Sequence, residues 1–460
     1  MTRNFFRRVG FGLRPEQDVP SDALEWAKSQ VNKVPEYQWT GYIPSTLEGR
    51  DFANSYSKAK KKARQKFKND PKGYEKLFNK PNQEKIIEQE NINLKIRYSE
   101  ALIGDNPVYD RLLWFWGNHF AIIEKFLSPE LFTGPYQREV IRANLTGNFE
   151  NLAGEVTTSW AMLDSLDNRT SIAPNSVKAK KERKKGRTPT LNENHARELL
   201  ELHTISPSAK FTQNDVINTA YIMAGWGARG TKKNYSQVKF SQDFHEPGEH
   251  IVLGKGYKQR NTNSKLKLFD LIADLVRQPS CREFISTKLC RHFITDNPTK
   301  EMVQPIIKTW EKTDGDLPSI HKTLLEVVYE HCKNTSKLNN PELWLIQTLN
   351  LYGSTGLEFS RISNILEELG QSPFRPLQPN GWSDLEEDWV SPEFLIRRLV
   401  FSRDIAFKRG NYGFRLNFDL NDLISKNFDD KDNILSYLSS ATNDTEKLIL
   451  LSPSKWMLYS

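Results

Sequence analysis

Apolar residues recur three and four positions apart over most of this chain, a spacing typical of helices that bury one face. The clearest helical stretches cover 266–277, 280–293, 299–312, 318–332 and 340–352. Apolar and polar residues alternate, as in a half-buried strand, only within 226–262, around Val238 and Ile251. The spacing therefore predicts an all-α fold, a globular array of many helices with a small β ribbon near residues 236–257.

Changes in composition divide the chain into three predicted regions. The 460 residues allow two to three domains of roughly 150 residues each. Residues 1–105 form an N-terminal helical region with a lysine-rich helix, whose basic run at 58–68 is interpreted as a solvated helix face. Residues 106–262 form a central helical domain with most of the polar motifs and the β ribbon. Residues 263–460 form a C-terminal helical domain.

Charge and apolar content narrow the class of protein. Lys and Arg number 65 against 57 Asp and Glu, which makes the chain mildly basic, with a formal net charge of +8. No apolar run reaches the ~18 residues that a membrane span requires. The three cysteines have neither disulfide-framework nor zinc-finger spacing. The opening residues lack the apolar stretch of a signal peptide, so we expect a cytoplasmic protein, or a periplasmic or exported one if a leader has been removed.

Segment 192–204 is the densest polar cluster on an apolar helix. Asn194 and Glu198 are four residues apart, and Glu198 and Glu201 are three apart, so all three are expected on one side of the helix. Two carboxylates one turn apart are a common way to offer oxygen ligands to a metal ion. The segment therefore contains candidate metal ligands.

The same helix also permits a structural interpretation. Arg197 lies four residues from both Glu193 and Glu201, a spacing that suits ion pairs along a surface helix. Asn192 would then act as the helix cap. Both interpretations stay open from the sequence.

Two histidines could complete a metal site. His119 ends a tryptophan-rich helix predicted from Pro107, and His245 and Glu246 lie in the polar part of the ribbon. Histidines and carboxylates from three segments would form a mixed nitrogen and oxygen site suited to one divalent zinc, iron, manganese or copper ion. A lone histidine on an apolar helix face is, however, more often a hydrogen-bonded core residue. The chain also lacks the HExxH, Walker A, GxSxG and GxGxxG motifs.

Two further polar stretches have functional and structural interpretations. Asp167 and Asn168 end a predicted helix, where Asp167 is either a further acid of the site or a turn residue. Residues 178–187 are mostly Lys and Arg and could bind the phosphate or sulfate groups of a polyanion. Such loops are more often only solubilising, and no aromatic residue is present there for base stacking, so nucleic acid is not the expected partner.

Short motifs follow one another from the N-terminus to residue 382. They are RRVGFG at 7–12, FWGNHF at 115–120, AMLDSLDN at 161–168, NENHARELLELHT at 192–204, AGW at 224–226, FHE at 244–246 with LG at 253–254, GQSPF at 370–374 and PNGW at 379–382. Together they resemble the motifs of the bacterial family catalogued as Domain of Unknown Function 1800, nearly end to end. The resemblance implies no established activity, although members are often exported. Glu246 stands where that family usually has Asp.

Metal-assisted catalysis is our first functional hypothesis, for a hydrolase or oxidoreductase that acts on a glycan or another acidic polymer. The roles assigned from the sequence are metal ligands for His119, Glu198, Glu201 and His245, general base for Glu246 or Asp167, anion orientation for Arg197, substrate binding for Asn168, Asn192 and Asn194, and sugar stacking for Trp116, Trp226 and Trp382.

Two alternatives use the same residues differently. In the first, the protein is a non-catalytic binding or assembly protein, whose polar cluster is a buried hydrogen-bond network and whose loop at 373–389 binds a partner protein. In the second, the protein binds a polyanion or nucleic acid through 178–187.

Overall fold

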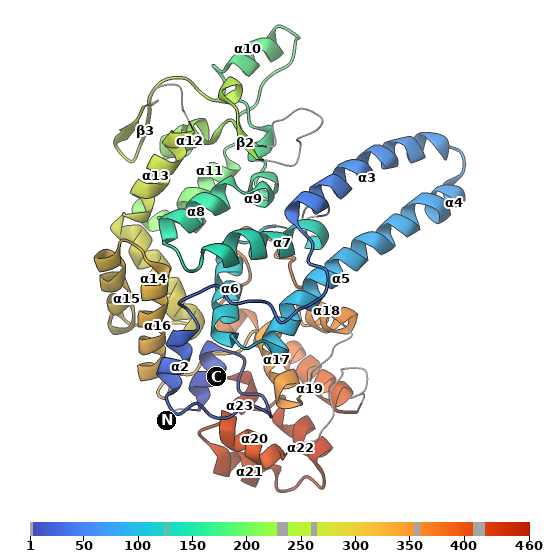
Figure 1. Ribbon diagram of the computed structural model, residues 1–460, viewed down its shortest axis with the longest axis vertical. Coiled ribbons are helices and arrows are strands. Elements are labelled where there is room, and N and C mark those ends of the chain that lie inside the picture. The colour runs from blue at the N-terminus through green and yellow to red at the C-terminus, as the bar shows by residue number, and fades with distance from the viewer. Residues whose placement is uncertain are drawn as a thin grey trace.

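The computed structural model confirms the predicted all-α fold (Figure 1). It describes residues 3–123, 125, 127, 129–227, 238–258, 265–353, 359–407 and 419–460. Within these ranges most residues are helical, and the strands form two small antiparallel sheets.

The N-terminal region contains a long helical hairpin that extends away from the body (Figure 1). The helices are α1 (Asn4–Val9), α2 (Ala23–Ser29), α3 (Thr46–Lys66), α4 (Pro71–Tyr74) and α5 (Lys80–Ile103), with a π-helical turn η1 (Glu75–Asn79) before α5. Ser45 and Glu48 form a capping box that starts α3. Tyr56, Phe78 and Ile86 form a small core between the two arms. The basic run at 58–68 lies mostly exposed on α3, as the sequence predicts.

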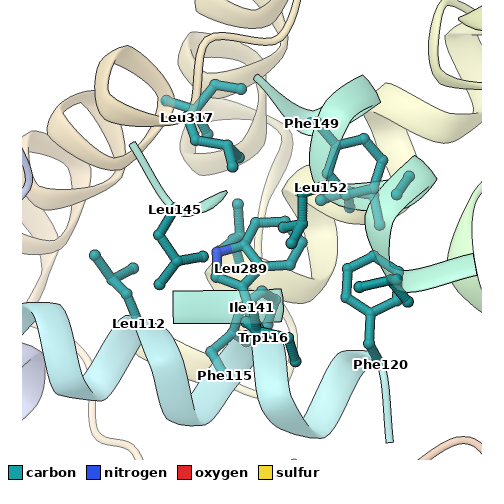
Figure 2. Packing of buried hydrophobic residues seen from close by; sticks show 14 of the residues in the cluster. Leu112, Phe115, Trp116, Phe120, Ile141, Leu145, Phe149, Leu152, Leu289 and Leu317 are labelled. Atoms are coloured by element: carbon teal, nitrogen blue, oxygen red, sulfur yellow. The ribbon is translucent and has the colours of Figure 1, made fainter. Parts of the chain in front are cut away.

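Helix α6 (Pro107–His119) runs through the centre of the molecule. Pro107 occupies its first turn, where a missing backbone N–H costs nothing. Leu112, Phe115 and Trp116 point from one side of α6 into the largest apolar cluster (Figure 2). The following elements are η2 (Pro129–Thr133), α7 (Gly134–Tyr136), η3 (Gln137–Arg142), α8 (Phe149–Thr158), α9 (Trp160–Ser165), η4 (Asn168–Thr170), α10 (Val177–Arg183), α11 (Asn194–Glu198), η5 (Leu199–His203), η6 (Pro207–Ala209) and α12 (Gln213–Met223).

The predicted β ribbon lies in the expected region. Among the described residues, it consists of two separate pairs of strands. Strand β1 (Trp226–Gly227) pairs with β2 (Lys239–Phe240), and β3 (His250–Val252) pairs with β4 (Lys255–Tyr257), both antiparallel. A short helix, η7 (Gln242–Phe244), follows β2. Leu253 is apolar and in phase with Ile251, yet its φ of 50° and the φ of 78° at Gly254 put both residues in a tight turn between β3 and β4.

Helices α13 to α17 match the five predicted stretches closely, since their apolar spacing is regular, and further helices follow them. In order, these helices are α13 (Leu266–Val276), α14 (Pro279–Phe293), α15 (Lys300–Thr313), α16 (Leu317–His331), α17 (Pro341–Leu351), α18 (Phe359–Glu368), η8 (Glu386–Asp388), α19 (Pro392–Phe407), α20 (Leu420–Asn427), α21 (Lys431–Leu438), α22 (Asp444–Leu451) and α23 (Lys455–Leu458). None of the helices in the described part of the chain combines the length and apolar character needed to cross a bilayer.

Two large apolar clusters meet at α6. The first contains Phe115 and Trp116 and draws its residues from Phe5 to Cys332. The second contains Trp114 and draws its residues from Phe11 and α5 and from the helices after residue 340. Residues from each of the three predicted regions take part in the first cluster, and the division at 105 and 262 stays a prediction. The position of α6 between the clusters places the candidate site at their junction.

Candidate functional site

The face of α6 that points away from the first cluster lines a pocket. Because Arg111, Trp114 and Asn118 are three and four residues apart, they lie on this one face. The pocket opens to solvent, and its empty volume of about 630 Å³ includes part of that open solvent. Its other walls include Arg97, Gln137, His292, Asn340, Glu342, Gln371, Phe374 and Trp382.

Asn118 attaches the loop at 379–384 to α6. Its side-chain amide donates to the carbonyl oxygen of Trp382 (2.8 Å), and its Oδ1 accepts from the Trp382 backbone N–H (2.7 Å). Gly381 has a φ of +77°, and a Cβ at this position would collide with the carbonyl and side-chain oxygens of Asn118. The FWGNHF and PNGW motifs therefore bind each other directly.

This attachment brings Asp384 to His292 of α14. His292 Nδ1 lies 2.6 Å from Asp384 Oδ1, and the two side chains are 8% and 11% exposed. His292 Nε2 is buried and has no hydrogen-bond partner among the described residues. Lys337 holds the loop in place, because its ammonium group pairs with Asp296 and donates to the backbone carbonyl of Asp384.

Opposing effects set the protonation of this pair. Burial alone would raise the pKa of Asp384, but His292, Lys337 and Lys288 outweigh it and lower that pKa to about 2. Burial lowers the pKa of His292 below its ordinary value of 6.5, against the opposing effect of Asp384. At pH 7 the pair is therefore an aspartate beside a neutral imidazole. The Nδ1–H donates to Asp384, which leaves the Nε2 lone pair free to accept a proton.

Two cations near the pair, Arg111 and Lys288, form no direct ion pair with a described residue, although Asp384 acts on both at longer range. Arg97 forms a two-pronged ion pair with Glu342 (2.8 and 3.0 Å). Arg111, which is 3% exposed, has no hydrogen bond or ion pair with a described residue. Lys288 likewise has no hydrogen bond or ion pair with a described residue, and burial lowers its pKa below 10.5. Cations without a direct ion pair beside the pocket favour an anionic ligand.

His119 lies deeper, behind Phe115. The Phe115 ring is 5.3 Å from that of His292 and 6.3 Å from that of His119. His119 Nε2 is 3.3 Å from the carbonyl oxygen of His203, and its Nδ1 has no partner among the described residues. Burial, then Lys288 and His203, lower the pKa of His119 well below 6.5. It is a neutral histidine of the core.

Helix α11 is tied to α12 through Gln213. Arg197 donates to Gln213 Oε1 (2.6 Å), and Gln213 Nε2 donates to Glu193 (2.5 Å). The structural interpretation predicted ion pairs of Arg197 with Glu193 and Glu201, four residues away. The Arg197 side chain donates to Gln213 of α12 instead. Asn192 Oδ1 accepts from the Asn194 backbone N–H (2.9 Å) at the start of α11, although the N-cap residue itself is Glu193.

The predicted metal ligands do not share one centre. A π-helical turn, η5, follows Glu198, so Glu201 does not keep the α-helical register that the prediction assumed. Burial, with Glu201 adding, raises the pKa of Glu198. His119, Glu198, Glu201 and His245 are all among the described residues. The described part of the chain contains no group of three or more His, Cys, Asp or Glu side chains placed to hold a metal ion. Metal binding stays a prediction from the sequence.

His245 and Glu246 belong to a network that fixes the ribbon. His245 Nδ1–H donates to a backbone carbonyl at the end of α12 (3.0 Å), and its Nε2 faces the Lys267 ammonium at 3.4 Å. Burial lowers the pKa of His245 to about 4. The Glu246 carboxylate accepts from the backbone N–H and side-chain amide of Asn175 (2.9 and 2.5 Å). These contacts give His245 and Glu246 a structural role in holding the ribbon in place.

Asp167 and Asn168 sit in a turn after α9. Asp167 has a φ of 62° and pairs with Lys125 at 2.9 Å. The buried Asn168 amide donates to the carbonyl oxygens of Met223 and Trp226 (3.2 and 3.3 Å), and so joins this turn to β1.

The basic stretch at 178–187 is partly neutralised by its own acid. Lys178 and Arg187 both pair with Glu182, at 2.9 and 2.6 Å. The other Lys and Arg side chains of the stretch are mostly exposed. Polyanion binding here stays a prediction.

Of the three predicted stacking residues, Trp382 lines the pocket. Trp116 is fully buried, and its indole N–H donates to His321 Nε2 (3.0 Å). Trp226 is buried against aromatic rings under the ribbon. Trp114, which the sequence did not single out, lines the pocket with Trp382.

Sequence reasoning missed the residues that the pocket brings together. His292 and Lys288 are four apart on an apolar helix, which is a usable signal for one polar face. Arg111 and its neighbour Asp110 interrupt an apolar stretch of helix, and Asp384 follows the PNGW motif by two residues. No spacing links Asp384 to His292, because 92 positions separate them.

Comparison with known proteins places the chain in a family. No curated protein and no solved structure matches it. The model of the family described as a protein of unknown function (DUF1800) matches residues 4–453 of the 460, which includes α6, α14 and the loop that bears Asp384. The match covers nearly the whole chain, and this protein belongs to that family.

Proposed function

We propose that this protein is an enzyme that binds a glycan in the α6 pocket and removes a proton with His292 as general base. The His292–Asp384 pair carries the proposal, because its carboxylate orients the ring, its Nε2 has no described partner, and His292 is one of the residues that line the pocket. Asp384 also stabilises the imidazolium that forms when Nε2 takes the proton. No described side chain bonds Nε2, so the proton comes from the ligand or from water.

The pocket lining supports a glycan as the ligand. Trp114, Phe374 and Trp382 offer aromatic surface for a sugar ring. Gln137, Asn340 and Gln371 offer side-chain amides for hydroxyl groups, the usual combination in sites that bind small polar ligands.

The assembly hypothesis receives less support from this arrangement. It placed a partner protein on the loop at 373–389. In that loop, the backbone of Trp382 bonds to Asn118 and the Asp384 carboxylate pairs with His292, so both residues are engaged within the protein.

Turnover by matched variants tests the proposal. We would incubate the full chain with neutral glucans and with uronic-acid polymers and measure the release of reducing ends. His292→Gln and Asp384→Asn are expected to lower the rate at least about 100-fold. His331→Gln, at the end of α16 and outside the pocket, is the control and should match the wild type. Wild-type activity that survives His292→Gln would contradict the proposal, as would no turnover of any polymer.

Chelation separates this mechanism from the metal-assisted one predicted from the sequence. The pair supplies a base without a metal ion, so protein dialysed against a chelator should keep its turnover. A loss that added zinc, manganese, iron or copper ions restore, and that His119→Ala reproduces, would favour the metal-assisted mechanism instead.

A further inference from the structure

The Arg111 guanidinium is a buried charge with no hydrogen bond or ion pair to a described residue, and Asp384 and Glu342 act on it only at longer range. It is 3% exposed, and its Nε has no hydrogen-bond partner among the described residues. Its described polar contact is a long cation–π approach to Phe293, at 5.4 Å. Burial lowers the pKa of Arg111 to about 10, so it still carries its charge at pH 7. A charged group held this way is costly unless an anion reaches it.

The acids nearby are already engaged. Glu342 accepts both prongs of Arg97 and the Tyr98 hydroxyl, and Asp384 is held by His292. Arg111 lies in the wall of the pocket itself, so an anion can enter from solvent.

The amides of the pocket also present donors. Gln137, Asn340 and Gln371 each use the side-chain oxygen as an acceptor, from Arg97, from a backbone N–H of α17 and from the Glu342 N–H respectively. Their NH2 groups have no partner among the described residues. A pocket with a free guanidinium and three free NH2 groups suits a ligand rich in acceptors.

We propose that the ligand is a uronic-acid glycan whose carboxylate binds Arg111, and that the reaction is β-elimination. This inference rests on the proposed function and names its substrate class. The Arg97–Glu342 pair in the same pocket shows that a guanidinium there can hold a carboxylate with two bonds. A carboxylate neutralised in this way acidifies the adjacent C–H, which gives His292 a proton that it can remove.

The step balances without an oxidant or a further reactant. His292 Nε2 takes the proton from the carbon next to the carboxylate. The C–H electron pair forms a C=C bond to the neighbouring ring carbon, and the C–O glycosidic bond on that carbon breaks. The leaving oxygen takes a proton from solvent, the imidazolium returns its proton to solvent, and the products are one hydroxyl end and one unsaturated uronate end.

Binding of small probes tests the carboxylate site without any turnover. Calorimetry on the full chain would compare sodium glucuronate, glucose and sodium sulfate at constant ionic strength. We expect binding of glucuronate and none of glucose, with Arg111→Gln raising the dissociation constant at least about tenfold. Arg111→Gln should also melt no lower than the wild type without ligand, since it removes an unpaired buried charge. Arg50→Gln, a buried arginine over Trp160, is the control that should bind as the wild type does.

The product identifies the reaction. Cleavage of polyuronates should produce the ultraviolet absorbance of a C=C bond conjugated to a carboxylate, and both His292→Gln and Arg111→Gln should abolish it. Glucuronate binding that is indifferent to Arg111→Gln, or equal binding of sulfate, would overturn the inference. Reducing ends released without that absorbance would overturn the elimination and leave the proposed base in place. Binding at Arg111 without any turnover would instead overturn the proposed function.

Discussion

At the scale of single residues, Asp110 shows how burial couples this fold to pH. Burial, with Glu100 adding, raises the pKa of Asp110 from 3.8 to about 7, against the opposing effects of Arg142 and Arg97. The folded protein holds this proton up to about pH 7, whereas the unfolded chain releases it near pH 4. The contribution of this carboxyl group to stability is therefore full below about pH 4 and is lost as the pH rises through 7.

Asp110→Asn removes that titration and keeps the shape. We expect the variant and the wild type to have the same free energy of unfolding near pH 4. At pH 8 the variant should be more stable by up to about 4 kcal/mol. Urea unfolding at several pH values between 4 and 8 measures the difference, and a difference that does not change with pH would contradict the assignment.

His292 sets the expected pH dependence of activity. Its pKa lies below 6.5 because burial disfavours the imidazolium, and Nε2 acts as a base when neutral. The rate should therefore rise with pH along an acid limb whose midpoint lies below 6.5, and then stay flat to pH 8. A profile that falls across pH 5 to 7 would mean that His292 acts while protonated.

The contrast between His119 and His292 shows what the sequence can and cannot reveal about single residues. His119 stands out because it sits in a motif, yet its ring is a neutral core group bonded to the His203 carbonyl. His292 stands in no motif that the sequence analysis recognised. Its importance comes from Asp384, which reaches it through tertiary packing rather than through spacing.

At the scale of elements, the loop at 379–384 depends on one glycine. Gly381→Ala would force a Cβ into the oxygens of Asn118 at a positive φ. We expect a loss of about 1–3 kcal/mol of stability and a fall in turnover comparable to that of Asp384→Asn, because the loop carries Asp384. Gly248→Ala is the matched control: its φ is +97°, and no atom lies within 4 Å of the added Cβ. Equal turnover in the two variants would show that the loop is not held by this contact.

Elements were predictable where one periodicity governed them. Helices α13 to α16 lie within a residue or two of the stretches predicted from apolar spacing. Within the ribbon, Leu253 is apolar and in phase with Ile251 but adopts a left-handed turn conformation, which apolar spacing alone does not predict. The prediction that Glu201 lies on the same side of the helix as Glu198 assumed α-helical spacing. The π-helical turn η5 changes that spacing from residue 199 onward.

At the scale of the whole molecule, Arg8 connects the start of the chain to the candidate site. Its guanidinium is 1% exposed and donates to the carbonyl oxygens of Ile294 (2.6 Å), Thr335 (3.0 Å) and Ser460. Ile294 directly follows α14, the helix that carries His292. The RRVGFG motif therefore contacts the residue that follows α14, a contact that the sequence alone does not show.

Arg8→Met tests this connection, because it keeps most of the side-chain volume and removes the donors. Three buried carbonyl oxygens lose a charged partner, so we expect a loss of about 2–4 kcal/mol in the free energy of unfolding, measured by urea denaturation. The end of α14 should also loosen, and turnover should fall while the dissociation constant for glucuronate changes little, since Arg111 lies on α6. Arg187→Met, on an exposed side chain paired with Glu182, is the control expected to leave both quantities close to the wild-type values. Full turnover in a destabilised Arg8→Met protein would show that Arg8 supports the fold without positioning His292.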